Sequence, residues 1–309
     1  VIAHFDTLKL EQIADNQVRV SGCRGSSPPS THKVCINTKG KYKSGIEVLL
    51  TGLNIEKKAE LYIDQIFHNL GGQEQFDEVD IQLIRSDKEN PATNEEAHAA
   101  LRISCTSSDP KKVNRLFNAK ITELSLATIP GNTSRGNSLG GGKETIVYWP
   151  ALIDSQKVTE VLHIDGRTQQ VLPTQRLGFE EIFYQEVPVS IAPAPTGKTI
   201  TAPLGTLFGA RSGDKGGCAN CGVWAKTDEA YAFLFNFLTV DQFKKLCPDV
   251  SEYEVIRYEL ANMRSLNFYI KGILKDGVSS NNRIDGQAKS FGEYLRAKTI
   301  DIPEVLLGY

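Results

Sequence analysis

The sequence lacks long apolar runs, a secretion signal and an excess of charge of either sign, and each shortage excludes a class of protein. None of its apolar runs approaches the roughly 18 residues that span a bilayer. The opening stretch, Val1 to Asp6, has neither the basic nor the apolar region of a signal peptide. Its 35 basic and 37 acidic residues leave a formal charge of -2, so no broad positive field is available for a nucleic acid or an anionic membrane. We therefore expect neither as a partner.

Cysteine and histidine are also sparse. Six cysteines in 309 residues are too few for a disulfide scaffold, which favours reduced thiols in the cytoplasm. The five histidines show no metal-ligand spacing, and none adjoins a Gly-x-Ser-x-Gly nucleophile motif. We expect no bound metal and no cofactor. The chain does not start with methionine, and its single one is Met263, which indicates a longer precursor.

What is present is typical of a globular α/β protein. Apolar residues make up 40% and charged residues 23%, and the length favours two domains. From residue 33 the pattern is β-β-α-β-β-α: a hairpin of strands at 33–37 and 45–50 with a turn near Gly40, a helix that Asn54 can cap and that ends at Gly71, strands at 79–84 and 101–106, and a helix capped by Asp109. This order favours a mixed sheet covered by helices.

Four prolines between residues 186 and 203 predict an extended connector, and we place the domain boundary there, giving domains 1–197 and 198–309. Strands at 206–210, 221–225, 254–260 and 266–274, with helices at about 228–247 and 290–298, follow. This is the composition of a ferredoxin-like α/β sandwich. The expected fold class is therefore α/β (α+β).

The main candidate site is the segment Arg211 to Gly217, in which charged groups stand between glycines. One hypothesis is a ligand-binding loop, with Arg211 and Ser212 holding an anionic group and Asp214 and Lys215 as catalytic residues. The alternative is a tight turn in which Asp214 pairs with a neighbouring cation. The Lys does not complete a P-loop, so nucleotide hydrolysis gains little support.

Cys218 and Cys221 follow with the spacing of a redox motif but without its strand-to-helix context, and strand periodicity favours buried or incidental thiols. Asn220, between them, is a candidate for binding substrate through its carboxamide. Two cysteines alone cannot complete a zinc site.

Weaker candidates lie elsewhere. Arg24, in the glycine-bearing loop 21–27, either binds a carboxylate or phosphate of the substrate or is a solvated surface residue. His32 is the single histidine kept as a catalytic candidate. Trp149 belongs to the core at a strand end or lines an apolar pocket. The glycine-rich segment 135–142 is typical of a linker or a lid.

Several of these segments resemble one family. Residues 204–225, with the run Arg-Ser-Gly-Asp-Lys-Gly-Gly at 211–217, resemble the signature of the small C-terminal domain of the acyclic terpene utilisation (AtuA-like) family. Residues 18–25, 33–35 and 147–152 look like the second half of that family's core domain. The sequence has Cys218 where the family commonly has Asp, which puts an acidic role at that position in doubt.

The resemblance implies a pathway more strongly than a reaction. It implies a protein of acyclic terpenoid or branched acyl catabolism, with an acyl or acyl-coenzyme A ligand and a core domain whose N-terminal portion lies upstream of residue 1. The leading hypothesis is an enzyme or part of one, of unassigned reaction class. The competing hypothesis is a non-catalytic assembly or ligand-binding subunit, and both are compatible with a homo-oligomer.

Overall fold

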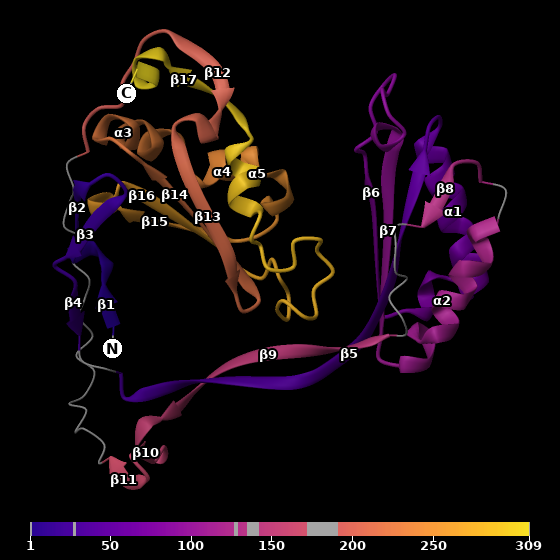
Figure 1. Cartoon of the computed structure of the whole chain (residues 1–309), viewed down its shortest axis with the longest axis horizontal. Coiled ribbons are helices and arrows are strands. Elements are labelled where there is room, and N and C mark those ends of the chain that lie inside the picture. Colours follow the sequence, from indigo (N-terminus) through magenta and orange to yellow (C-terminus); the bar gives the residue numbers. More distant parts are fainter. Residues whose placement is uncertain (1, 27–28, 127–128, 135–141, 172–190, 309) are drawn as a thin grey trace. The chain divides into compact units, whose positions relative to one another are not determined.

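The computed structural model describes residues 2–26, 29–126, 129–134, 142–171 and 191–308 (Figure 1). Two compact units emerge from the contacts between residues: Asn37–Val147 forms one, and Val1–Ile36 together with Tyr148–Tyr309 forms the other. The division does not follow the order of the sequence, because strands β5 (Thr31–Thr51) and β9 (Lys143–Asp154) run through the limits of both units.

The unit Asn37–Val147 is a sheet with one face covered by two helices. Its strands are arranged β6-β7-β5-β8, with β9 paired to β5. The other strands are β6 (Glu78–Ile84), β7 (His98–Ser107) and β8 (Asn132–Ser134), and the helices are α1 (Ile55–Leu70) and α2 (Arg115–Thr122). The registers of β5–β7, β5–β8 and β6–β7 are all antiparallel, where the sequence favoured a mixed sheet.

This unit corrects one prediction and confirms another. The expected hairpin at 33–50 is wrong: these residues form the single strand β5, and Gly40 lies inside it. A glycine is needed at this position because a β-carbon would overlap the side chain of Thr145. Helix α1 begins after Asn54, as predicted, and ends at Gly71 in the left-handed conformation with φ of 83°. Asp109 does cap a helix, accepting from Lys111 N at 2.9 Å, but this helix is a short 3-10 turn before α2.

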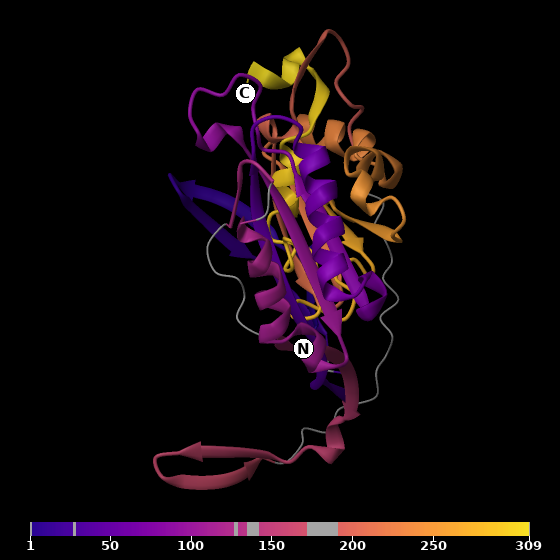
Figure 2. The ribbon, with the colours of Figure 1, turned by 90° about the vertical axis from the view of Figure 1, so that its right-hand side faces the viewer.

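The C-terminal part of the other unit is built on a four-stranded antiparallel sheet. Its order is β13-β14-β16-β15, with β13 (Phe208–Lys215), β14 (Cys218–Ala225), β15 (Val255–Leu260) and β16 (Ser265–Ile270). Helices α3 (Asp228–Phe237), α4 (Val240–Leu246) and α5 (Phe291–Arg296) accompany it, and the turned view of Figure 2 shows these helices grouped together. The expected helix 228–247 is divided at Leu238 because Thr239 caps a new helix, accepting from Gln242 N at 3.1 Å.

The topology is that of a ferredoxin-like sandwich with its last strand moved to the front. Reading from β14, the elements follow the order β-α-β-β-α, and β13 occupies the sheet position that the closing strand of that motif would take. A two-residue turn, Gly216–Gly217, joins β13 to β14. The moved strand therefore forms one edge of the sheet and β15 forms the other.

Shorter elements complete this unit. Strand β12 (Thr199–Pro203) pairs with β17 (Thr299–Pro303), and three further two-stranded pairs occur. These pairs are β1 (Ile2–His4) with β4 (Arg24–Ser26), β2 (Lys9–Ala14) with β3 (Gln17–Ser21), and β10 (Glu160–Ile164) with β11 (Arg167–Val171).

The expected fold class is confirmed: the chain is α/β, with a ferredoxin-like domain in its C-terminal part. The domain boundary near residue 198 stays a prediction. Within the described ranges, every helix is too short or too polar to cross a membrane.

Candidate functional site

One face of the C-terminal sheet is open. Strand residues alternate between two faces, and the face toward the helices is fully buried at its centre by residues such as Cys221, Val223, Leu266 and Phe268. The opposite face is partly exposed: Trp224 on β14 keeps 38% of its surface and Tyr258 on β15 keeps 50%. Three of the candidate residues named from the sequence, Arg211, Lys215 and Asn220, lie on this open face.

The register arranges the open face in three cross-strand rows. The first is Gly209, Trp224, Ser265 and Leu260; the second is Arg211, Gly222, Asn267 and Tyr258; the third is Gly213, Asn220, Tyr269 and Ile256. Lys215 and Cys218 continue the face beyond the third row.

A cationic edge lies along β13. Arg211 and Lys215 point to the open face on either side of Gly213, and Lys289 reaches the same place, with its Nζ 3.2 Å from where a β-carbon of Gly213 would be. Among the described residues the guanidinium of Arg211 has neither a hydrogen bond nor an ion pair. Three positive groups around a residue without a side chain form a setting that suits an anion.

The centre of the open face carries two carboxamides. Asn220 Nδ2 donates to Asn267 Oδ1 at 3.0 Å, which leaves the Asn220 oxygen and the Asn267 amino group available. Beside them, a β-carbon on Gly222 would have its nearest neighbours at 3.7 and 3.9 Å, so the surface is hollowed at this position. The centre can therefore both donate to and accept from a bound ligand.

Apolar groups occupy the remaining part of the face. Ile256, Tyr258 and Leu260 follow one another on the outward side of β15. The indole of Trp224 extends across Gly209, where a β-carbon would overlap the ring. From β13 to β15 the face thus changes from cationic to amide to apolar over three strand spacings, about 14 Å.

Tyr269 and Cys218 meet where the amide and cationic parts join. Tyr269 shares a hydrogen bond with Cys218, and this bond, with partial burial second, raises the pKa of Tyr269 to about 12. The backbone N–H of Gly272 donates to Cys218 Sγ at 3.4 Å. Of the thiols expected to be buried or incidental, Cys221 is buried, and burial raises its pKa to about 12. Cys218 is only partly buried, because residues three apart on a strand face opposite sides.

The predicted loop 211–217 is strand as far as Lys215, and this separates the charged residues. Ser212 and Asp214 point toward the helices, away from Arg211 and Lys215. The Ser212 hydroxyl donates to Lys289 O at 3.3 Å and accepts from Gly292 N at 2.8 Å, which fastens the start of α5 to the strand. Roles for Ser212 and Asp214 in ligand chemistry stay predictions.

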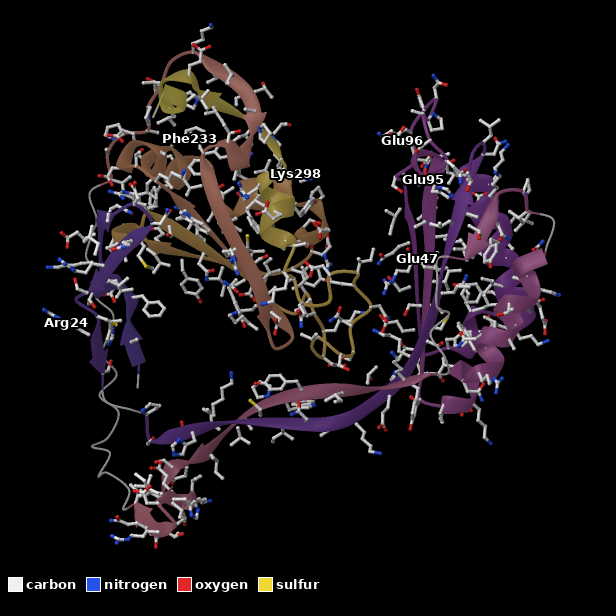
Figure 3. All side chains as sticks on the ribbon, viewed as in Figure 1. Arg24, Glu47, Glu95, Glu96, Phe233 and Lys298 are labelled. Carbon is white, nitrogen blue, oxygen red and sulfur yellow. The ribbon has the colours of Figure 1, made fainter. Side chains whose placement is uncertain are left out.

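The other candidates lie apart from this face. Arg24 belongs to strand β4, where it pairs with His4 and its backbone N–H donates to Thr7 Oγ1 at 3.0 Å (Figure 3). His32 Nε2 lies 3.7 Å from Glu160 Oε1, and Trp149 is 61% exposed. The linker or lid predicted at 135–142 falls almost wholly outside the described residues. In the ranges described, no three His, Cys, Asp or Glu side chains are grouped as metal ligands.

Sequence reasoning missed Lys289, Asn267, Tyr258 and Tyr269. Asn267 and Tyr269 could have been predicted, because residues 265–271 alternate strictly between polar and apolar types. This alternation is the pattern of a strand with one open face. Lys289 had no such signal, since it reaches the face from the segment before α5.

Comparison with known families finds two matches. The model of the acyclic terpene utilisation family protein AtuA matches residues 1–164, and the model of the AtuA ferredoxin-like domain matches residues 202–301. No curated protein and no solved structure matches the chain.

Proposed function

Since the chain belongs to the acyclic terpene utilisation family AtuA, we propose that it binds an acyclic terpenoid carboxylate, or the corresponding acyl-coenzyme A, on the open face of its C-terminal sheet. Membership of the family implies a role in acyclic terpene utilisation. The ligand and its position are our proposal, and the chain would act in the cytoplasm as all or part of a catabolic enzyme.

The observation that carries the proposal is the polarity gradient across the face. The cations around Gly213 suit a carboxylate or phosphate. The apolar side chains of β15 and the ring of Trp224 suit a branched hydrocarbon chain, and the carboxamides of Asn220 and Asn267 suit the carbonyl between them. No carboxylate occurs within the three rows, so an anionic ligand meets no repulsion there.

The chemistry open to these residues is positioning and proton transfer. Lys215 is the one predicted catalytic residue on this face, and its Nζ donates to Asp214 O at 3.0 Å. Tyr269, held protonated, can donate to a carbonyl oxygen that gains negative charge. Arg211, whose guanidinium can donate two parallel hydrogen bonds, would hold the anionic end.

The test is calorimetric titration of citronellic acid, geranyl-coenzyme A and free coenzyme A into the chain. We expect Arg211→Gln to weaken binding about 10- to 100-fold, which corresponds to the loss of a charged hydrogen bond of about 1.5–3 kcal/mol. Lys245→Gln, an exposed cation on α4, should leave binding unchanged. Equal affinities for the two variants would remove the open face from consideration.

A second candidate function, a non-catalytic assembly subunit, is favoured by the two exposed hairpins. Leu10, Val18 and Val20 share one face of β2–β3 and are each at least half exposed. On β10–β11, Leu162 and Ile164 lie on one face and keep 46% and 59% of their surface exposed. Apolar hairpin faces of this kind are commonly covered in an assembly. Failure of all three ligands to bind would favour this function.

A further inference from the structure

The open face leaves Trp224 and Tyr258 exposed, whereas sites for small ligands bury most of the ligand surface. Resting on the proposed function, we propose that a second copy of this chain packs its own open face against this one. A two-fold axis along the strands, between β14 and β16, then places β13 of each copy opposite β15 of the other. The second copy would then cover the face on which the ligand is proposed to bind.

The second row supplies two complementary pairs across this interface. Under this axis Arg211 lies opposite Tyr258 of the second copy, which allows a cation over an aromatic ring. In the same row Asn267 lies opposite the hollow above Gly222. Each pair occurs twice because the interface is symmetric.

Of the neighbouring rows, the first shows the same complementarity of size. In the first row the large indole of Trp224 faces Ser265 of the second copy. In the third row Ile256 of the second copy faces Gly213, above which the side chain of Lys289 lies. Interfaces between proteins need this matching of projections with hollows.

Charged residues beyond the third row bear on the direction of the two-fold axis. Beyond the third row Lys215 pairs with Cys218, and Lys271 N donates to Glu254 O, which places Lys215 opposite Glu254 of the second copy. Lys271 lies in the same row and pairs with Glu254 of its own chain at 2.7 Å. An axis across the strands would instead place β13 against β13, with Arg211 near the other copy's Lys215, and like charges would repel. The charges therefore select the axis along the strands.

Area and composition also suit this pairing. Four strands about 4.8 Å apart, with six residues each about 3.3 Å long, present on the order of 400 Å² of flat sheet. Projecting side chains add to this area, and specific interfaces bury roughly 800 Å² per partner. Tryptophan, tyrosine and arginine, the residues that dominate binding energy at interfaces, are all present, and the centre has no charge.

The test is a pair of cysteines in the full 309-residue chain, with the exposed Cys23 and Cys35 replaced by serine. In the Arg211→Cys/Tyr258→Cys variant the two thiols of one chain are three strands apart, about 14 Å, too far for a disulfide, whose Cα atoms lie within about 7 Å. We expect a covalent dimer on mild oxidation of the double variant. Each single variant should stay uncrosslinked, because neither position faces itself.

Sedimentation without ligand gives an independent readout. We expect the unsubstituted chain to sediment at twice 34.0 kDa. Asn267→Arg, which fills the hollow above Gly222 of the second copy, should give the monomer mass, while Gln242→Arg on α4 should not. A monomeric unsubstituted chain, or a dimer that persists in folded Asn267→Arg, would overturn the pairing. An unsubstituted dimer that binds none of the ligands would leave the pairing intact and defeat the proposed function.

Discussion

Asn220 and Asn267 lie on neighbouring strands of the C-terminal sheet and share a hydrogen bond, with 3.0 Å between Asn220 Nδ2 and Asn267 Oδ1. The bond fixes both carboxamides on the open face and sets which polar atoms stay available. It also joins the cationic edge to the apolar strip, because Asn220 belongs to the row of Gly213 and Asn267 to the row of Tyr258.

This bond gives the first prediction. Asn267→Asp keeps an oxygen that accepts the hydrogen bond from Asn220, so the fold should remain. It also places a carboxylate on the face that is proposed to bind an anionic ligand. We expect the affinity for citronellic acid to fall about tenfold, as one unfavourable charge contact of roughly 1.4 kcal/mol would produce. Calorimetry measures this, with Gln242→Glu on α4 as the control. An unchanged affinity would argue against an anion beside Asn267.

The second prediction concerns the glycine that the turn between β13 and β14 needs. A β-carbon on Gly217 would overlap the carbonyl oxygen of Lys275, so Gly217→Ala should lower the free energy of unfolding by about 1–3 kcal/mol. Gly308 has nothing within 4 Å of such an atom, and Gly308→Ala should be neutral. Denaturant unfolding compares the two. Equal stability of both variants would show that the turn tolerates a side chain and that Gly217 is present for another reason.

The third prediction concerns alkaline pH. The Cys218 hydrogen bond raises the pKa of Tyr269 to about 12 from 10.0, so the folded chain retains this proton where the unfolded chain loses it. The contribution is fully present below pH 10 and is lost as the pH rises toward 12. We expect the stability of Tyr269→Phe to fall less steeply over this range. Unfolding in urea at several pH values measures the slope, and identical slopes would contradict the shift.

The fourth prediction concerns acid and the other unit. The carboxylate of Asp77 accepts hydrogen bonds from the hydroxyl and the backbone N–H of Ser108, and it forms an ion pair with Lys41. These contacts lower the pKa of Asp77 from 3.8 to about 2. A lowered carboxyl pKa stabilises the fold above about pH 4 and loses this effect as the pH falls toward 2. Asp77→Asn should therefore show a smaller loss of stability between pH 4 and pH 2. A loss as large as in the unsubstituted chain would rule out the shift.

Local chemistry explains what could be predicted from the sequence. Helix α1 was predicted closely because its apolar spacing and Gly71 are local signals. The strands of the C-terminal sheet follow from alternation, and the family resemblance supplied the ferredoxin-like fold. These features depend on residues that are near one another in the chain.

What failed depends on distant contacts. Gly40 was read as a turn, but it is a strand residue that lets β5 and the Thr145 side chain approach each other. The charged run 211–215 was read as a loop because several glycines suggested one; pairing with β14 makes it a strand and sends Asp214 and Arg211 to opposite faces. Lys289 joins the site only through the tertiary fold.

The most direct test of the open face uses its own fluorophore. The chain has two tryptophans, Trp149 and Trp224, so Trp149→Phe leaves Trp224 as the only reporter. Titrating citronellic acid and geranyl-coenzyme A into this variant should change its tryptophan emission saturably, at the affinity found by calorimetry, while Trp224→Phe should show no change. A silent Trp224 at ligand concentrations where calorimetry detects binding would contradict a site on this face.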